Sequence, residues 1–147
     1  MPRLLMLVTL LAIAVAPSLC EAASKRLHVI ATVEQQTFTG NINSPKLGDR
    51  LINNVTLADD RGRQVGTGGA VCTVVSEPPQ ATLVQCLLSA VFADGEIVFG
   101  GLAPFPVVGA VGHFAILGGT DRFSKARGDA TLIVLPNGDV DTTFDLD

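Results

Sequence analysis

The chain has 147 residues, of which 48% are hydrophobic and 16% are charged, and this composition excludes a largely disordered polypeptide. The length fits a single domain with a sizeable core. The formal net charge is −4 and no cluster of Lys and Arg occurs, so the composition argues against a nucleic-acid-binding protein, which needs clustered basic side chains.

The beginning of the chain predicts a secretory signal peptide, residues 1–22. Arg3 supplies the positive charge at its start, an apolar run extends from Leu4 to Ala16, and the small residue Ala22 provides a cleavage site. The apolar run is shorter than the ~20 residues that cross a bilayer. We therefore expect residues 23–147 to form one secreted domain, extracellular or, in a Gram-negative host, periplasmic; a retained membrane anchor is the alternative.

Eight short apolar runs separated by turn residues make up the expected domain. No segment has sustained helical periodicity, and such a succession of short strands is typical of an all-β sandwich or barrel. The clearest run is the last, where Val140, Thr142, Phe144 and Leu146 alternate with polar residues and predict one buried face. The predicted strands are Leu27–Phe38, Arg50–Leu57, Ala70–Val75, Thr82–Phe92, Glu96–Leu102, Gly112–Leu117, Ala126–Leu135 and Asp139–Leu146.

The connections between these runs predict antiparallel pairing. Asp94-Gly95 and Asn137-Gly138 favour two-residue type I′ hairpin turns, in which both central residues take positive φ. Pro78-Pro79 predicts a wider loop, and the Pro- and Gly-rich residues 103–112 are expected to cross one end of the sheet. Some strands, such as residues 81–92, are apolar on both faces, which indicates either a neighbouring subunit or a covering loop.

Two cysteines remain after the predicted cleavage, and the hairpin register places them opposite each other. A hairpin centred near Pro79 pairs Val74 with Val84 and Cys72 with Cys86. Directly opposed Cα atoms lie ~4.5–5.5 Å apart, a distance that a disulfide accepts. We predict a Cys72–Cys86 disulfide; two buried thiols, or a reactive Cys72 that lines a pocket, are the alternatives. With two histidines and no CxxC pair, no metal site is predicted.

Two parts of the chain carry recognisable motifs. Residues 63–75 contain Arg-Gln-Val-Gly and Gly-Gly-Ala-Val-Cys-Thr-Val-Val, preceded by Leu47-Gly48-Asp49, and residues 114–128 contain Phe-Ala-Ile-Leu-Gly-Gly-Thr, Arg-Phe and Ala-Arg-Gly. The first part resembles the front half of the allene oxide cyclase barrel, and the second resembles a motif that allene oxide cyclases share with dirigent proteins. The resemblance covers roughly residues 32–146. It implies an eight-stranded antiparallel β-barrel, oligomers such as the trimers of plant members, and a cofactor-free cyclase activity in some bacterial relatives.

The resemblance also implies a set of pocket residues. Glu34 matches a catalytic Glu of the family's first strand, Gln36 an Asn beside it, and Cys72 a pocket Cys, while Asn53 or Asn54 approximates a further Asn. Because Glu34 and Gln36 are two positions apart on a strand, their side chains are expected to share a face. A buried Glu34 would polarise a substrate or water; the alternative is that both side chains face solvent.

The Gly-rich second motif has a structural interpretation of its own. Glycines permit backbone angles closed to other residues, so the strand can turn sharply at the rim of the barrel. Arg127 is expected to pair there with Asp121 or Asp129. A phosphate-binding loop is the alternative. The predicted structural residues are Gly118, Gly119, Thr120, Arg127 and Gly128.

These features predict a secreted barrel that binds a small hydrophobic molecule. The resemblance implies that the barrel guides a cyclisation, isomerisation or coupling without a cofactor, although the family's pocket Tyr has no counterpart and Ala103 occupies its region. The alternative is a non-catalytic, extracellular lipophile-binding or structural barrel, so enzyme status stays open. A homotrimer or homodimer is expected, and Asn54-Val55-Thr56 is a glycosylation sequon if the host is eukaryotic.

Overall fold

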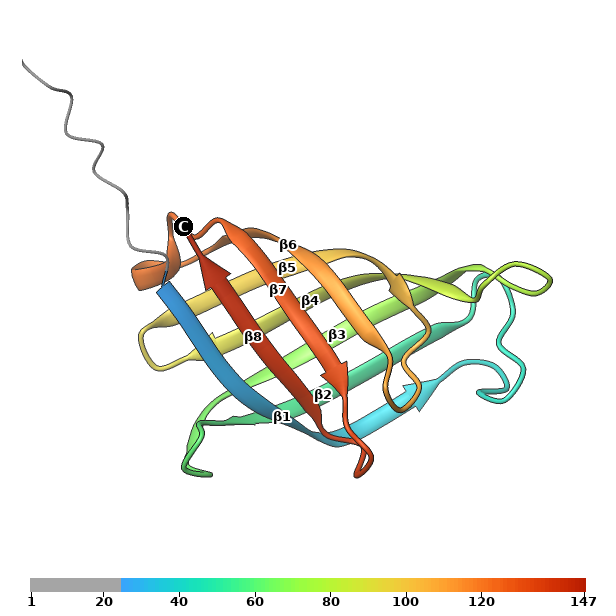
Figure 1. Cartoon of the computed structure of the whole chain (residues 1–147), viewed down its shortest axis with the longest axis horizontal. Helices are drawn as coiled ribbons and strands as arrows, with labels where there is room; N and C mark the ends of the chain where they lie inside the picture. Colours follow the sequence, from blue (N-terminus) through green and yellow to red (C-terminus); the bar gives the residue numbers. More distant parts are fainter. Residues whose placement is uncertain (1–24) are drawn as a thin grey trace, which may run out of the picture.

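Residues 25–147, the part of the chain that the computed structural model describes, form a closed barrel of eight antiparallel strands. Each strand pairs with its neighbours in chain order, and the last strand pairs with the first (Figure 1). The predicted signal peptide, residues 1–22, lies outside the described residues. The elements are β1 (Lys25–Phe38), β2 (Arg50–Ala58), β3 (Gln64–Ser76), β4 (Leu83–Phe92), β5 (Gly95–Pro104), β6 (Val111–Gly119), the 3₁₀-helix η1 (Asp121–Phe123), β7 (Gly128–Val134) and β8 (Val140–Leu146).

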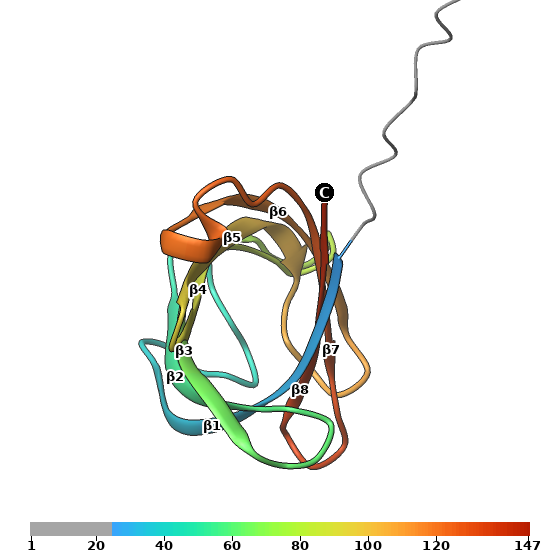
Figure 2. The same ribbon diagram turned by 90° about the vertical axis from the view of Figure 1, so that its left-hand side faces the viewer.

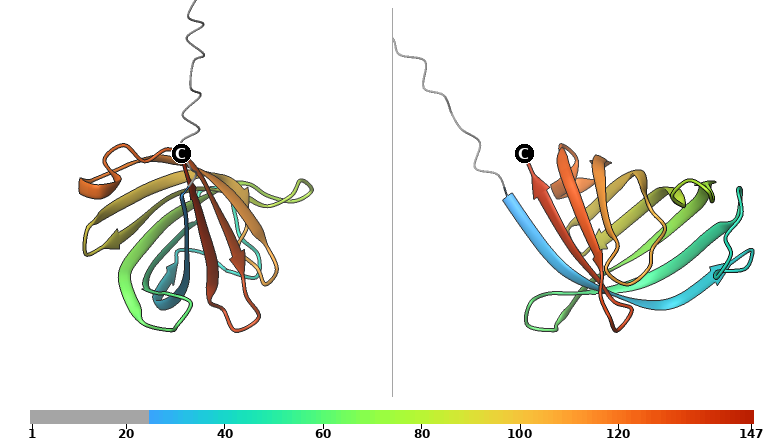
Figure 3. Two further views of the ribbon diagram at one scale, coloured as in Figure 1. Left: turned by 60° about the vertical axis from the view of Figure 1, so that its left-hand side comes forward. Right: turned by 45° about the vertical axis from the view of Figure 1, so that its right-hand side comes forward.

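The closed ring settles the choice between a sandwich and a barrel in favour of the barrel. All eight predicted strands exist, and Figure 2 shows them arranged around a common axis. The strands are strongly twisted and cross the barrel obliquely (Figure 3), as closure of a sheet requires. Among residues 25–147, no helix is long and apolar enough to span a membrane.

The third strand starts earlier than predicted, at Gln64 instead of Ala70. Three glycines lie inside this extension, and two of them permit a close approach of the neighbouring strand β4. A Cβ on Gly66 would lie 2.3 Å from the Val91 carbonyl oxygen, and one on Gly68 would lie 2.6 Å from that of Ser89. Glycine therefore belongs to the interior of this strand because of packing between strands, which the local sequence does not reveal.

The two hairpin turns are not of the predicted type I′. Gly138 has φ +88° and Gly95 has φ +141°, but Asp121 is the only described residue other than glycine with a positive φ. In the last hairpin the Gly138 N–H donates to the Leu135 carbonyl at 3.0 Å, and the Leu135 N–H donates to that of Asp139 at 2.8 Å. The turn is therefore centred on Pro136 and Asn137, one position earlier than predicted, and type I′ is excluded there because proline is confined to negative φ.

Aromatic packing closes one end of the barrel. Phe144 of β8 is fully buried, as the predicted alternation of that strand requires, and its ring meets Phe99 edge-on with centroids 5.1 Å apart. Beyond it, Phe123 of η1 is buried and packs on Phe92 with centroids 5.6 Å apart. In Figure 1 this closed end, with η1, lies at the left.

The opposite end, which we call the mouth, is formed by four loops. They join β1 to β2, β3 to β4, β5 to β6 and β7 to β8, and they comprise residues 39–49, 77–82, 105–110 and 135–139. The first two of these loops extend to the right in Figure 1. The β5–β6 loop lies within the Pro- and Gly-rich segment that was predicted to cross one end, and it contributes to the site described next.

Candidate ligand-binding site

Three cavities follow one another along the interior of the barrel, from the mouth toward the closed end. The outer cavity has a volume of about 370 Å³, the middle one about 90 Å³ and the inner one about 80 Å³. Asn53 and Val140 line all three. Leu51 is shared by the outer and middle cavities, and Leu88 by the middle and inner ones. Because they share lining residues, the three cavities are adjacent to one another, and we refer to them together as the stepped lumen.

The lumen wall is apolar because inward positions alternate along each strand. On β2 these positions are Leu51, Asn53, Val55 and Leu57, which line one or more of the cavities. The outer cavity is completed by aliphatic and aromatic side chains of the mouth loops. These are Ile42, Phe105, Pro106, Val107 and Val108.

No ionisable side chain lines any of the three cavities. The polar side chains in the wall are all neutral: Gln36, Asn53 and Thr142. Thr142 is 4% exposed and lies on the inward face that the alternation of the last strand predicts. Residues 25–147 contain no group of three His, Cys, Asp or Glu side chains arranged to hold a metal ion.

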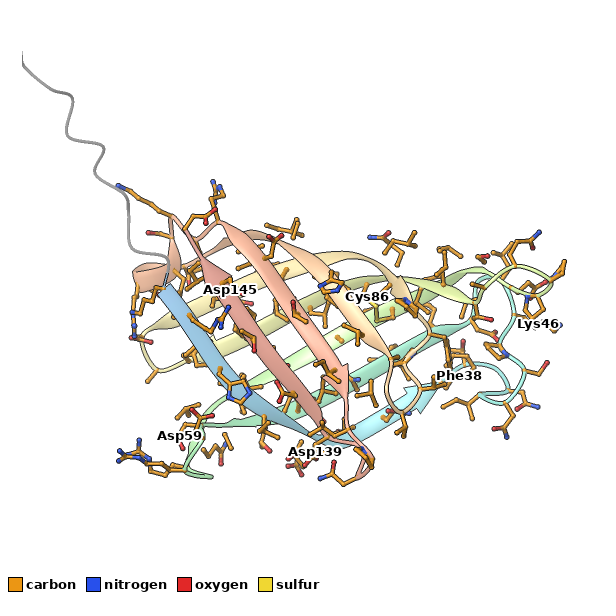
Figure 4. All side chains as sticks on the ribbon, viewed as in Figure 1. Phe38, Lys46, Asp59, Cys86, Asp139 and Asp145 are labelled. Carbon is orange, nitrogen blue, oxygen red and sulfur yellow. A yellow bond between two sulfur atoms is a disulfide. The ribbon has the colours of Figure 1, made fainter. Side chains whose placement is uncertain are left out.

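The predicted disulfide between Cys72 and Cys86 is confirmed. The two residues are register partners on β3 and β4, as are Val74 and Val84, and the S–S distance is 1.99 Å. Both cysteines are buried and line the middle cavity, and Cys86 is labelled midway along the barrel in Figure 4. Cys72 therefore faces the lumen as half of a disulfide and not as a free thiol.

The two adjacent asparagines of β2 lie on opposite sides of the wall. Asn53 is half-buried and faces the lumen, opposite Ala70 of β3. Asn54 is exposed on the outer wall, where its Nδ2 donates to Gln35 Oε1 at 3.3 Å. The sequence left open whether Asn53 or Asn54 is the pocket Asn, and the structure places Asn53 at the lumen.

Glu34 and Gln36 do not share a face, contrary to the expectation from their spacing. Val33 pairs with Val55 but Gln35 pairs with Asn54, so Glu34 is the extra residue of a β-bulge. Glu34 is exposed on the outer wall, where its Oε1 accepts a hydrogen bond from the Thr56 hydroxyl at 2.8 Å.

Gln36 lies beyond the bulge and faces the mouth of the lumen. It is the register partner of Asn53 and lines the outer cavity, although its side chain is largely exposed. The structure thus brings Gln36, Asn53 and Cys72 to the lumen and leaves Glu34 and Asn54 outside it.

The Gly-rich motif lies at the closed end and lines none of the three cavities. The Thr120 N–H donates to the Glu96 carbonyl at 2.9 Å, and the Glu96 N–H donates to Thr120 Oγ1 at 3.1 Å. A Cβ on Gly119 would lie 2.3 Å from that same carbonyl oxygen. Gly118, at φ +152°, stands where the pairing of β6 with β5 shifts register.

The charged residues near this motif pair differently from the prediction. The Arg127 guanidinium donates to the Ala126 carbonyl at 2.6 Å, while the ion pairs at this end join Arg122 to Asp94 and Arg26 to Asp145. Gly128 follows with φ +115°. The geometry supports a structural role for the motif.

A cluster that the sequence did not indicate lies on the outer wall. His28 of β1 stands between Asp60, in the β2–β3 loop, and Asp141 of β8, with a carboxylate facing each ring nitrogen. The hydrogen bond with Asp60, and then that with Asp141, raise the pKa of His28, while desolvation lowers it. The pairing of β1 with β8 brings Asp141 to His28 and the pairing of β1 with β2 brings Asp60, so no local signal predicts the cluster.

Comparisons with known proteins identify the fold. No family model and no curated protein matches the chain in sequence. A pyocyanin demethylase superposes with a TM-score of 0.75 at 24% identity, covering 84% of this chain and 100% of that chain. AbnU, described as an exo-specific intermolecular Diels-Alderase, superposes with a TM-score of 0.72 at 17% identity, covering 84% of this chain and 98% of that chain. The Diels-Alderase AbmU from Streptomyces koyangensis superposes with a TM-score of 0.66 at 17% identity, covering 82% of this chain and 64% of that chain. The chain therefore shares the eight-stranded barrel fold of these proteins.

Proposed function

We propose that this protein is a secreted binding barrel whose lumen holds a small hydrophobic molecule. The observation that carries the proposal is the stepped lumen, whose three adjacent cavities extend from the mouth to Phe99 and Phe144 and are lined mainly by aliphatic and aromatic side chains. Concave apolar sites with a few placed polar groups are typical of small-molecule binding. Each Å² of apolar surface that the ligand buries contributes about 25 cal/mol.

The comparisons support this proposal at the level of the fold. The pyocyanin demethylase and the Diels-Alderases are named for reactions of small molecules, and they have the same barrel. The sequence resemblance to allene oxide cyclases and dirigent proteins points in the same direction. Export is supported by the predicted signal peptide and by the Cys72–Cys86 disulfide, since disulfides persist in oxidising compartments.

A second candidate function is catalysis of a cyclisation, isomerisation or coupling without a cofactor. In a lumen without ionisable side chains, catalysis would come from holding a reactive molecule in a productive conformation and excluding water. Acid–base chemistry would need a carboxylate or imidazole at the lumen. The outward position of Glu34 therefore favours a binding protein over an acid–base catalyst.

Binding is tested with the neutral fluorescent probe N-phenyl-1-naphthylamine and with native mass spectrometry of protein purified from its own host. We expect saturable binding of one probe per barrel, weakened at least tenfold by Val140→Phe, because Val140 lines all three cavities, including the outer one that is wide enough for the probe. Val71→Phe is the matched control, because Val71 faces outward. Wild-type protein that carries no molecule and binds no lipophilic probe would overturn the proposal.

A further inference from the structure

The charges around the lumen restrict what it can hold, beyond the requirement for a hydrophobic ligand. The three cavities differ in width and in their distance from the mouth, yet none has an Asp, Glu, Lys, Arg or His in its lining. We infer that the ligand is uncharged over its whole length, including the end that lies at the mouth. This inference rests on the proposed binding function and specifies the class of molecule.

Within the middle and inner cavities, an ion would have no partner. Transfer of an ionised group from water to an apolar site is unfavourable unless an opposite charge or several hydrogen bonds compensate for the lost hydration. The wall offers the Asn53 amide and, deeper, the Thr142 hydroxyl. An amide both donates and accepts hydrogen bonds, so Asn53 suits a carbonyl or hydroxyl of a neutral ligand.

At the mouth, a charged head group would also lack a partner. Three exposed side chains of the mouth loops are aliphatic: Ile42 is 46% exposed, Val107 59% and Val108 62%. The carboxylates of these loops already accept hydrogen bonds: Glu77 from the Leu47 N–H at 3.0 Å, Asp49 from the Lys46 N–H at 2.8 Å, and Asp139 from the Asn137 Nδ2 at 2.8 Å.

The basic side chains of this end do not change that conclusion. Lys46 and Arg50 line none of the three cavities. A fatty acid or an alkylammonium that placed its tail in the lumen would therefore leave its charge over an apolar rim.

The volumes add a constraint on shape. The middle and inner cavities, at about 90 and 80 Å³, are each smaller than the cavity of about 150 Å³ that accommodates benzene in an engineered protein. The outer cavity, at about 370 Å³, is larger. The ligand is therefore a tapering neutral molecule, with a slender aliphatic part toward Phe144 and its bulkier part at the mouth.

The inference is tested by displacement of N-phenyl-1-naphthylamine with three ligands of equal chain length: decan-1-ol, decanoate and decylammonium. On wild-type protein we expect decan-1-ol to displace the probe at concentrations at least tenfold lower than either ion. Equal displacement by an ion would overturn the inference while leaving the binding function intact. If the probe does not bind at all, the proposed function itself fails.

A matched pair of variants separates the charge of the lumen from the charge of the whole protein. Asn53→Asp places a carboxyl of nearly the same size in the wall, and Asn54→Asp makes the same change on the outer face. At pH 8 we expect Asn53→Asp to weaken the binding of decan-1-ol at least tenfold and to strengthen the binding of decylammonium. Asn54→Asp should change the binding of neither ligand. Equal effects of the two variants would overturn the inference, and the wild-type comparison stands if Asn53→Asp does not fold.

Discussion

The imidazole of His28 and the carboxylate of Asp141 lie 3.0 Å apart across β1 and β8, the strand pair that closes the barrel. The other ring nitrogen of His28 faces Asp60, so the loop between β2 and β3 is tied to the same point. Two carboxylates on one ring favour the imidazolium, because only in that form do both nitrogens donate. This agrees with the raised pKa of His28.

The cluster predicts a pH dependence of stability. Since the pKa of His28 is higher in the folded state than the unfolded value near 6.5, its stabilising effect is complete below that value and is lost as the pH rises through the folded pKa. We expect His28→Gln to lower the free energy of unfolding more at pH 5.5 than at pH 9, as measured by urea denaturation. His113→Gln is the control, because the His113 ring is hydrogen-bonded to the neutral Thr131 hydroxyl and not to a carboxylate. A difference between wild type and His28→Gln that does not vary with pH would contradict the assignment.

The disulfide in the lumen wall predicts a large loss of stability on its removal. Cys72 and Cys86 are separated by 14 positions, and closing a loop of this length adds about 3 kcal/mol in the chain-entropy model. The double variant Cys72→Ala/Cys86→Ala should therefore unfold at a lower urea concentration by a corresponding amount. Reduction of the wild type should add two hydrogens in mass. Labelling of both thiols in oxidised protein would show that the bond is absent.

Two glycines with positive φ predict unequal costs of adding a methyl group. Gly138 has open space around it, so Gly138→Ala should cost only the backbone penalty of about 1 kcal/mol. A Cβ on Gly128 would lie 2.0 Å from the Asp145 carbonyl oxygen, so Gly128→Ala must also distort the pairing of β7 with β8. Thermal unfolding should give a melting temperature for Gly128→Ala well below that of Gly138→Ala. Equal melting temperatures would refute the packing argument.

The outward position of Glu34 predicts that its charge does not affect the lumen. Glu34→Gln should change the affinity for N-phenyl-1-naphthylamine by less than twofold, and Thr56→Val, which removes the partner hydroxyl, should behave alike. Gln36→Leu, at the mouth, should alter the affinity because Gln36 lines the outer cavity. Loss of probe binding in folded Glu34→Gln protein would mean that this carboxylate reaches the lumen.

Oligomerisation stays a prediction, and the outer wall indicates where to test it. Ile52, Val71 and Leu87 are register partners across β2, β3 and β4, and all three are exposed on the outer face. A contiguous apolar row of this kind is typical of contact surfaces. We expect light scattering to give a multiple of the monomer mass, reduced toward the monomer by Leu87→Gln but not by Thr131→Gln on β7. A monomeric wild type at all concentrations would exclude the prediction.

The sequence predicts those features that depend on local pattern. The eight strands and the Cys72–Cys86 pairing follow from alternation and from the position of one loop between two strands. The bulge at Glu34 does not, because it depends on how β1 aligns with β2, and a rule of two-residue spacing then assigns the wrong face. The early start of β3 at Gln64 depends likewise on carbonyl groups contributed by β4.

The bulge on β1 has a consequence for insertions and deletions. Deletion of Glu34 itself would leave Gln36 and Phe38 facing inward, because Gln35 already pairs with Asn54 as the residue after Val33 would in a regular strand. Deletion of Thr37, beyond the bulge, would instead reverse the alternation, so that Phe38 would turn outward. Phe38 would then lose its edge-on contact with Phe105, whose ring centroid is 5.8 Å away, near the mouth (Figure 4). The aromatic contact between Phe38 and Phe105 at the mouth therefore depends on the number of residues in β1 as much as on the identity of the two side chains.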